Sequence, residues 1–566
     1  MSLNQRMIKA NEKQREAIEA KGSIVVRAGA GTGKTQMLAG RFVHEVIANK
    51  LSPLEIVAVT YTEKAAAELR ARVRMLMLQH GSPQLAAEAD AAMIGTIHSL
   101  AAHICREFGE LIDLPTDFAI LDKSESDILL AGIIDEAMFR IDPQIIERIG
   151  YTRLRGFLKH LAEDPLASSK ALSYDEDHYN NLLKQEKEKE FANLIASKAW
   201  NEARDLLPIY RGAEGDKLEE QRRVALDIIK DAESQGRLDI ELVNSFTKGF
   251  RSNLGSKNNW QPEEQENVRK ILSALKEELK TAIEVIDLEI GPAEEQMFEE
   301  SKLVKQAFEE FTKYYRQRKL QLGVMDFADL EIRSLELLEK IPVRDHYALR
   351  WKAILVDEYQ DTNPTQEKIL NHLAMSGARL TIVGDEKQSI YAFRGADPRV
   401  FEKKLEKIGN SVSLDESFRS HARLVENTNS IFRPILGRIS QDLTSKRYSN
   451  NLKAPFIRTI IPNNEDEADV GSPTAEATLI SEEIAQILNN NVEIFDSAAG
   501  KMRPAEPRDI VVLSRNWKPL NLIARKIRET GIPAVTPGGE GLLETREAKD
   551  ALSVLEFAID PTNDIA

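Results

Sequence analysis

The chain has 566 residues, of which 42% are hydrophobic and 30% charged, a balance typical of soluble globular proteins with sizeable cores; at ~150 residues per domain it predicts about three or four domains. We find no apolar run near the ~20 residues that a membrane helix needs, and the N-terminus has no apolar signal core, so we expect neither a membrane segment nor secretion. Cys105 has no second cysteine to pair with, so no internal disulfide can form, which fits a cytoplasmic protein. The net charge of −15 argues against a nucleic-acid partner, although a local basic or aromatic groove can lie on an acidic protein.

Short β-branched runs alternate with helix-like segments in the first hundred residues and again after residue 350. Strands that alternate with helices predict a parallel, doubly wound sheet. The predicted strands are 23–26, 55–60, 93–96, 353–357 and 380–385.

The region between residues 106 and 321 has a different pattern. Strand runs disappear, and long stretches rich in Lys, Glu and Leu, such as 181–198 and 264–285, predict helices. We interpret the region as a helical domain inserted into the first α/β domain, with Trp200 and Trp260 in its core.

A second α/β unit is predicted after residue 403. Its candidate strands are 412–414, 477–480 and 510–513, and the acidic segment 463–474 is predicted to be an exposed loop. The predicted domain ranges are 1–105 and 322–402 for the first α/β domain, 106–321 for the helical domain and 403–566 for the second α/β unit.

A glycine-rich loop follows the first predicted strand and opens a helix. In such a loop the backbone N–H groups converge on phosphate oxygens, and the helix N-terminus favours negative charge. Lys34 would hold the β- and γ-phosphates of ATP, and the Thr35 hydroxyl would bind Mg²⁺. Ala28 stands where the usual pattern has glycine. The loop residues are Ala28, Gly29, Ala30, Gly31, Thr32, Gly33, Lys34 and Thr35.

An acidic pair closes the apolar strand at 353–357. Asp357 at a strand end can reach the Mg²⁺ bound by Thr35, and Glu358 can orient and deprotonate the attacking water. With the phosphate-binding loop upstream, these residues predict an ATP-hydrolysing site.

The motifs together resemble the UvrD/Rep/PcrA group of superfamily 1 DNA helicases. The segment 357–361, with the sequence DEYQD, matches the group's acidic box, and 383–396 matches its next motif almost throughout. Further similarities, in the family's order, are 58–68 and 95–99 to two DNA-contact motifs, 326–330 to the re-entry into the first motor domain, and 414–420 to the start of the second.

The resemblance implies RecA-like motor domains with a parallel sheet plus an inserted all-helical domain. It also implies ATP and Mg²⁺ as cofactors, single-stranded and duplex DNA as partners, a role in DNA repair, 3′-to-5′ polarity and a monomer. A repair or nuclease partner is a further expectation.

The resemblance also assigns roles to individual residues. Gln14 would recognise adenine, Phe418 would stack on it, Gln388 would sense the γ-phosphate, and Arg419 would reach the γ-phosphate from the second motor domain. The ATP set is the loop 28–35 with Gln14, Gln36, Phe418 and Arg419; the catalytic set is Lys34, Asp357, Glu358, Gln388 and Arg419; the DNA set is Thr60, Tyr61, Thr62, His98, Tyr391, Phe393 and Arg394. Considered alone, His98, Tyr391 and Phe393 would more often be structural.

Several positions depart from the family's pattern. Gln36 stands where arginine is common, which weakens one nucleotide contact. Glu63 replaces asparagine in the first DNA-contact motif, where a carboxylate is unfavourable beside a DNA backbone. Phe418 replaces a tyrosine and Phe393 a tryptophan.

The sequence ends at Ala566, before the family's later motifs would occur, so 403–566 would be an incomplete second motor domain. Three hypotheses follow. The chain is the N-terminal portion of a DNA helicase or translocase, the motor of a helicase–nuclease, or a fragment that binds ATP and single strands but unwinds little. The long helical insertion suits helicase–nuclease relatives, although no nuclease motif is present.

Overall fold

The computed structural model describes residues 10–375, 377–392, 395–447, 457–459, 473–496, 499–536 and 546–559. The chain divides into two compact units. One comprises Thr35–Val412 and the segment ending at Arg27, and the other comprises Ala28–Lys34 and the segment starting at Ser413. The four predicted domain ranges, with boundaries at 105, 321 and 402, stay predictions.

A six-stranded sheet forms the centre of the first unit, with the order β3-β2-β6-β7-β1-β8. The pairs from β3 to β1 are all parallel, which confirms the predicted parallel sheet. β2 and β6 are buried at every position, as expected of strands covered on both faces. The strands are β1 (Ile24–Ala28), β2 (Ile56–Thr60), β3 (Met93–Thr96), β6 (Ala353–Val356), β7 (Arg379–Gly384) and β8 (Ser411–Leu414).

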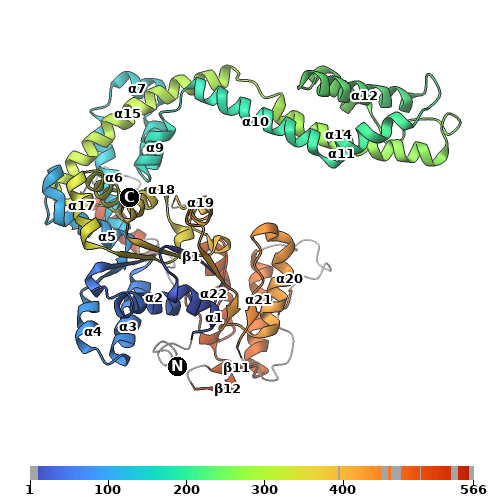
Figure 1. The fold of residues 1–566 in the computed structure, drawn as a ribbon. Coiled ribbons are helices and arrows are strands. Elements are labelled where there is room, and N and C mark those ends of the chain that lie inside the picture. The colour runs from blue at the N-terminus through green and yellow to red at the C-terminus, as the bar shows by residue number, and fades with distance from the viewer. Residues whose placement is uncertain are drawn as a thin grey trace. The chain divides into compact units, whose positions relative to one another are not determined.

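Helices cover both faces of this sheet. Figure 1 shows α2 and α3 on one face and α5, α17 and α18 on the other. The core on the second face joins side chains from α5, α16, α17 and α18 to strand residues such as Val57, Ile354 and Ile382. The helices of this part are α1 (Glu12–Glu19), α2 (Lys34–Ile47), α3 (Glu63–Gln79), α4 (Pro83–Asp90), α5 (Ile97–Phe108), α16 (Phe327–Leu338), α17 (Ile341–Arg350), α18 (Pro364–Ala374) and α19 (Pro398–Ile408).

The carboxyl edge of the sheet determines where polar loops begin. Parallel strands end at the same edge, which is where open α/β sheets bind ligands. β2 ends at Thr60, β3 at Thr96, β6 at Val356 and β7 at Gly384. The segments predicted to contact DNA, metal and γ-phosphate therefore all begin at this edge.

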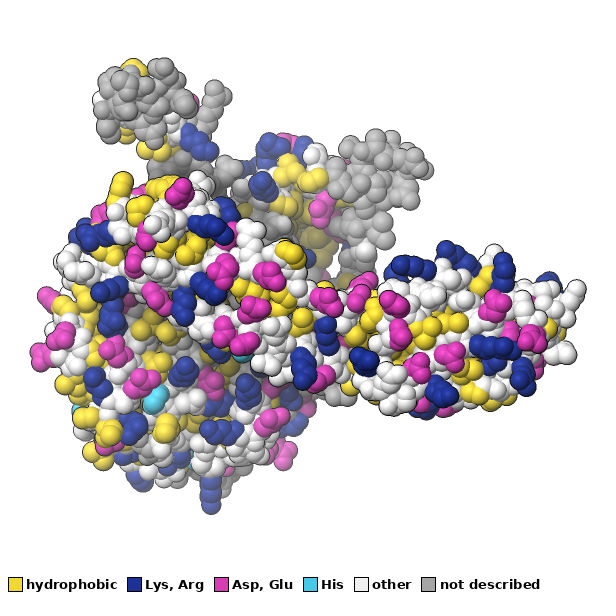
Figure 2. All heavy atoms as spheres, turned by 90° about the horizontal axis from the view of Figure 1, so that it is seen from above, with side chains coloured by type: hydrophobic (Ala, Val, Ile, Leu, Met, Phe, Trp, Pro, Cys, Tyr) yellow, Lys and Arg dark blue, Asp and Glu magenta, His cyan; other side chains and the backbone are white. Residues whose placement is uncertain are grey.

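The inserted region is helical, as predicted, except for β4 (Ala119–Ile120), which pairs with β5 (Val324–Met325) where the chain leaves and re-enters the sheet domain. One hydrophobic cluster joins α6, α7, α8 and α15, and another joins α10 to α14 and contains Trp200 and Trp260, whose predicted core positions are confirmed. Figure 2 shows acidic and basic side chains interspersed over the insertion. The helices are α6 (Lys123–Met138), α7 (Pro143–Ile149), α8 (Tyr151–Leu161), α9 (Pro165–Ala171), α10 (Glu176–Ala196), α11 (Lys198–Leu206), α12 (Lys217–Gln235), α13 (Ile240–Gly249), α14 (Pro262–Ile286) and α15 (Pro292–Leu322).

The second unit corrects two predicted strands. Residues 477–480 belong to α21, where Ala477, Ser481 and Ile484 are buried at helical spacing. The segment 510–513 alternates between half-buried and exposed side chains, but within the described residues no strand pairs with it. The third predicted strand, 412–414, forms within β8, but it joins the edge of the six-stranded sheet next to β1 and not a sheet of a second α/β unit as predicted.

Short strands and helices make up the rest of the second unit as described. Its small core joins α21 to α22 through Ala477, Ile484, Ile523 and Ile527. Most of the predicted loop 463–474 lies outside the described residues. The elements are β9 (Glu416–Ser417), α20 (Ala422–Leu436), β10 (Thr444–Ser445), α21 (Pro473–Asn489), β11 (Glu493–Asp496), β12 (Lys501–Pro504), α22 (Trp517–Glu529) and α23 (Arg546–Ile559).

Cys105 is a buried free thiol, and burial raises its pKa to about 12. Among the described helices, none has both the length and the apolar composition needed to cross a bilayer.

Candidate functional site

The glycine loop between β1 and α2 has the backbone that phosphate binding needs. Gly31 and Gly33 adopt φ values of 75° and 81°, which glycine reaches without a steric cost. Thr32 is buried, and its hydroxyl donates to the Gly29 carbonyl at 2.8 Å, closing the turn. The following helix starts at Lys34, so its N-terminal N–H groups lie next to the loop.

The loop packs against the segment predicted to open the second motor domain. The Phe418 N–H donates to the Gly31 carbonyl at 2.9 Å, and the Ser417 hydroxyl donates to the Ala30 carbonyl at 3.2 Å. A Cβ on Gly31 would lie 2.6 Å from the Cβ of Arg419, so only glycine fits there. The structure thus brings the loop together with Phe418 and Arg419, which lie almost 400 positions away in the sequence.

Gln14 lies in a capping box at the start of α1. Its N–H donates to Asn11 Oδ1 at 2.7 Å, and its side-chain Oε1 accepts from the Asn11 N–H at 3.1 Å. The side chain is buried, and its place is fixed by the helix cap. The sequence contains the capping pattern Asn-x-x-Gln, but the sequence analysis did not predict that Gln14 takes part in a helix cap.

Gln36 follows the loop on the first turn of α2. Its Oε1 accepts a hydrogen bond from Arg72 Nη1 on α3 at 3.3 Å. An arginine from another helix therefore contacts the position at which the family commonly has one. Thr35, its neighbour, is half-buried.

The acidic box begins directly after β6. Asp357 is buried, and its Oδ1 accepts from the Glu358 N–H at 3.0 Å. Glu358 has φ 49° and ψ 44°, a left-handed conformation that is uncommon for a side-chain-bearing residue. Such strain is found where the surroundings impose it, often at functional sites.

Gln360 joins the acidic box to the segment after β7. Its Nε2 donates to Glu358 Oε2 at 2.8 Å, and its Oε1 accepts from the Asp385 N–H at 3.0 Å. Asp385 in turn accepts from Gln388 Nε2 at 2.7 Å and pairs with Lys387 at 2.8 Å. Gln360 and Asp385 lie in the two predicted motifs 357–361 and 383–396, but the sequence predicts no role for either, because only the fold shows that they meet.

Two aromatic residues predicted to contact DNA stack on each other. The rings of Tyr61, after β2, and Tyr391, after β7, have centroids 4.5 Å apart and planes at 28°. Both are half-buried at the carboxyl edge of the sheet. The other two residues predicted from this motif, Phe393 and Arg394, lie outside the described residues.

The threonines after β2 have structural partners. The Thr60 hydroxyl is buried and donates to the Thr62 carbonyl at 3.1 Å. Thr62 is the N-cap of α3, and its hydroxyl accepts from the Ala65 N–H at 3.1 Å. Both residues therefore shape the loop that carries Tyr61.

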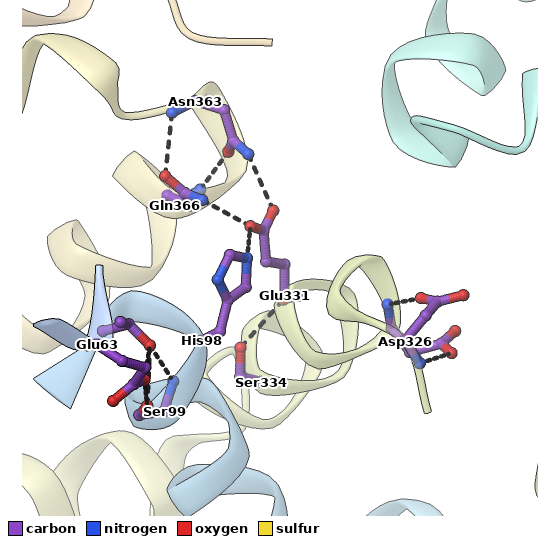
Figure 3. Close-up of polar contacts among 10 residues, drawn as sticks. Glu63, His98, Ser99, Asp326, Glu331, Ser334, Asn363 and Gln366 are labelled. Carbon is purple, nitrogen blue, oxygen red and sulfur yellow. Dashed lines mark hydrogen bonds and ion pairs between the residues drawn. The ribbon is translucent and has the colours of Figure 1, made fainter. Parts of the chain in front are cut away.

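His98, predicted to contact DNA, is held in a polar cluster between α5, α16 and α18 (Figure 3). Its Nε2 lies 3.1 Å from Glu331 Oε1, and its ring packs against Phe327 with centroids 4.6 Å apart. Glu331 is nearly buried and also accepts from Asn363 at 3.0 Å and Gln366 at 2.7 Å. These contacts anchor His98 within the fold.

Glu63 has a local use for its carboxylate. Its Oε1 accepts from the Thr96 hydroxyl at 2.9 Å and the Ser99 hydroxyl at 2.8 Å, as Figure 3 shows for the contact with Ser99. Glu63 begins α3 and Thr96 ends β3, so the carboxylate links the two predicted DNA-contact motifs.

The re-entry segment at 326–330 is held by a buried cation. Lys319 Nζ lies 2.8 Å from Asp326 Oδ2 and also pairs with Asp329. Burial would raise the pKa of Asp326, but the charge and hydrogen bond of Lys319 hold it below its usual value. Burial and the Asp326 carboxylate raise the pKa of Asp329. Lys319 thus stabilises the join between the insertion and α16.

Thr35 and Asp357 offer donor types that suit the Mg²⁺ of a bound nucleotide. The described residues contain no group of three or more His, Cys, Asp or Glu side chains able to hold a metal ion. Mg²⁺ usually binds proteins through one or two side chains and completes its shell with phosphate and water. A hydroxyl from Thr35 and a carboxylate from Asp357 are the ligand types that this mode requires.

Sequence comparison with known proteins finds similarity to ATP-dependent helicases. The sequence model of the UvrD/REP helicase N-terminal domain matches residues 10–409. The chain is 27% identical to a subunit of the ATP-dependent helicase/nuclease of Alkaliphilus metalliredigens, over 98% of this chain and 51% of that protein. It is 25% identical to the protein of the same name from Staphylococcus aureus strain JH9, over 98% of this chain and 50% of that protein. The chain thus spans about half the length of these curated relatives.

Proposed function

The chain belongs to the UvrD/REP helicase family, and we propose that it is the ATP-binding portion of an ATP-dependent DNA helicase or single-strand translocase that moves 3′ to 5′. The observation that carries the proposal is the packing of the glycine loop against Phe418 and Arg419. A ligand cradled by the loop would contact residues from both predicted motor domains. The polarity rests on family resemblance.

The nucleotide would be held by residues with separate tasks. Backbone N–H groups of the loop and the Lys34 ammonium would bind the β- and γ-phosphates, and Phe418, whose side chain is exposed, would stack on adenine. Gln14 would contact the adenine edge. Thr35 and Asp357 would hold Mg²⁺, which supplies positive charge against the phosphates when bound.

Hydrolysis would use the acidic box. Glu358 would orient a water and accept its proton as the water oxygen bonds to the γ-phosphorus. The bond from the γ-phosphorus to the bridging oxygen breaks, and that oxygen leaves on ADP with the electron pair. Arg419 would stabilise the negative charge on the transferred phosphoryl group, and Gln388 would report its presence to the DNA-contact segments.

DNA would bind at the edge that carries the aromatic residues. Bases of any sequence can stack on tyrosine, each stack being worth roughly 1–3 kcal/mol. Tyr61, Tyr391 and Phe393 would alternate in gripping the strand while Thr60, Thr62, His98 and Arg394 line its path.

A second candidate function is that of the motor in a helicase–nuclease. One observation favours it: the relatives carry the name of a helicase/nuclease. The nuclease would lie on further sequence or on a partner protein. Co-purification of a DNA-cleaving partner, or DNA cleavage by the chain itself, separates this function from that of a helicase alone.

The proposal also covers the cellular compartment and the oligomeric state. We place it in the cytoplasm, because its only cysteine is a buried free thiol, which fits a reducing compartment. By family resemblance it would act as a monomer apart from any repair or nuclease partner.

ATP turnover with and without single-stranded DNA tests the proposal. A DNA motor hydrolyses ATP several-fold faster when a strand is bound. Turnover that does not respond to DNA would contradict the motor function, and turnover near zero beside tight binding of ATP and DNA would favour the third alternative, a binding module.

A further inference from the structure

Gln360 is a buried glutamine whose side chain links two strand ends. It is 2% exposed and lies in the short 3₁₀ turn Tyr359–Asp361, directly after the acidic pair. Its Nε2 donates to Glu358 Oε2 at 2.8 Å, while its Oε1 accepts from the Asp385 N–H at 3.0 Å. Both ends of the amide are therefore engaged, one by a carboxylate after β6 and one by the backbone after β7.

The contact with Glu358 adds to a backbone restraint on the same residue. Glu358 is in the left-handed region, and its N–H is held by Asp357 Oδ1 at 3.0 Å. The backbone of Glu358 thus fixes where its side chain starts, and Gln360 fixes where its carboxylate ends.

The contact with β7 is close enough to dictate the residue at the strand end. A Cβ on Gly384 would lie 2.8 Å from Gln360 Oε1 and 2.9 Å from Phe401 Cε2, so a larger residue there would displace the amide or the ring. The Ser389 hydroxyl also donates to the Gln360 carbonyl oxygen at 3.1 Å. The segment 384–389 therefore contacts Gln360 at two points: the Asp385 N–H binds its side chain, and the Ser389 hydroxyl binds its backbone carbonyl.

The same segment contains the predicted γ-phosphate sensor. Gln388 Nε2 donates to Asp385 Oδ2 at 2.7 Å, and Lys387 Nζ lies 2.8 Å from Asp385 Oδ1. A continuous chain of hydrogen bonds therefore runs from Glu358 through Gln360 and Asp385 to Gln388.

We propose that Gln360 is a positioning residue for ATP hydrolysis, which holds the Glu358 carboxylate toward the attacking water and ties it to the sensor segment 385–389. The inference rests on the proposed function and deepens it. Gln360 would act through Glu358 and not on ATP itself, so its loss should misplace the base while the phosphate-binding loop stays intact.

The test uses Gln360→Met, which keeps the side-chain volume and removes every hydrogen bond of the amide: those to Glu358 and Asp385, and a longer one of 3.3 Å from Nε2 to Asp361 Oδ2. We expect kcat for strand-stimulated ATP hydrolysis to fall about 10- to 100-fold, the size of effect that a misplaced catalytic group has, while KM for ATP changes less than about two-fold. The matched control is Gln265→Met, which makes the same substitution at a glutamine that is 4% exposed in the helical insertion. Its kcat should be unchanged.

Two further variants separate positioning from general stability. Gln360→Glu keeps the volume and the acceptor oxygen but sets a carboxylate against Glu358, so kcat should fall at least as far. The double variant Gln360→Met with Glu358→Gln should be no slower than Glu358→Gln alone, because both act on the same group.

The outcomes distinguish this inference from the function on which it rests. If the unaltered chain shows strand-stimulated turnover and both Gln360 variants keep kcat within two-fold, the positioning role is overturned and the function stands. A fall in kcat that adds in full to the effect of Glu358→Gln would also overturn it. If the unaltered chain shows no strand-stimulated turnover, the proposed function itself fails.

Discussion

The carboxyl edge of the sheet and the helical insertion both contain buried charged side chains. At the edge these side chains surround a predicted catalytic residue, and in the insertion they stabilise the fold. At the sheet edge, Asp357 and Asp385 follow directly after strands and are bonded to neighbours in the predicted motifs. In the insertion, Asp216 caps α12 and accepts hydrogen bonds at 2.9 Å from Leu218, Ser256, Asn259 and Trp260.

The difference lies in what each network holds in place. Asp216 ties the start of α12 to the loop 256–260 and to a buried tryptophan, which are features of folding alone. The sheet edge orients Glu358, whose backbone is strained. Variants at the edge should therefore change turnover with little loss of stability, and variants in the insertion should do the reverse.

Of the variants that compare the two regions, Lys34→Ala should have the largest effect, which is on turnover. Loss of the ammonium removes charge that stabilises the phosphates, so strand-stimulated turnover should fall on the order of 10²–10³-fold or more. Steady-state ATPase measurement checks this, with a melting temperature that stays within about 2 °C. Lys159→Ala, at an exposed site in α8, is the control. Unchanged turnover in the Lys34 variant would remove the loop from the ATP site.

A smaller but clear effect is expected on stability from Asp216→Asn. The amide that replaces one carboxylate oxygen faces other donors, so the insertion should lose about 3 kcal/mol of unfolding free energy. Turnover of the folded protein should not change. Denaturant unfolding checks the first expectation, with Asp205→Asn as control, since Asp205 is an exposed partner of Arg204 and should cost at most about 1 kcal/mol. Equal losses in the two variants would contradict the role of Asp216.

The same carboxylate predicts a pH dependence. Burial by itself would raise the pKa of Asp216, but donors led by the Ser256 N–H outweigh it and hold the pKa well below its usual value. The stabilisation is therefore complete above the unfolded-state pKa of about 3.9 and is lost as the pH falls toward the folded-state value. Acid titration of unfolding should show a steeper loss below about pH 4 in the unaltered chain than in Asp216→Asn.

The smallest expected effect concerns single-strand affinity. Tyr391→Ala removes one predicted stacking surface, so affinity should fall by roughly 1–3 kcal/mol, and ATP affinity without DNA should not change. Tyr61→Ala should act alike, and the double variant should lose less than the sum because the rings also contact each other.

Fluorescence anisotropy with a labelled single strand measures these affinities. Tyr174, which stacks on His178 in the insertion with centroids 4.0 Å apart, offers a matched aromatic control. An equal loss from Tyr174→Ala would show that the comparison between the two regions does not hold for DNA binding.

Local patterns predicted much of the sheet and of the insertion. Short β-branched runs predicted five strands of the central sheet, namely β1, β2, β3, β6 and β7. The Lys- and Glu-rich stretches predicted α10 and α14. The prediction of a strand at 477–480 was wrong because a short apolar run does not distinguish a strand from a helix, and burial in α21 follows the helical period.

The contacts within the site depend on tertiary structure. No local signal joins His98 to Glu331, which lie 233 positions apart, or Gln360 to Asp385. The left-handed backbone conformation of Glu358 also could not be predicted from the sequence, because glutamate does not favour that conformation. The family resemblance located the motifs, and the fold showed how they are connected.

The most direct test of the hydrolytic centre measures ATP binding and strand-stimulated turnover together in Glu358→Gln. We predict ATP affinity within about two-fold of the unaltered chain and turnover lower by about 10²–10⁴-fold, because the base is lost while the phosphate-binding loop remains. Turnover equal to that of the unaltered chain would contradict the assignment of this strand end as the hydrolytic centre.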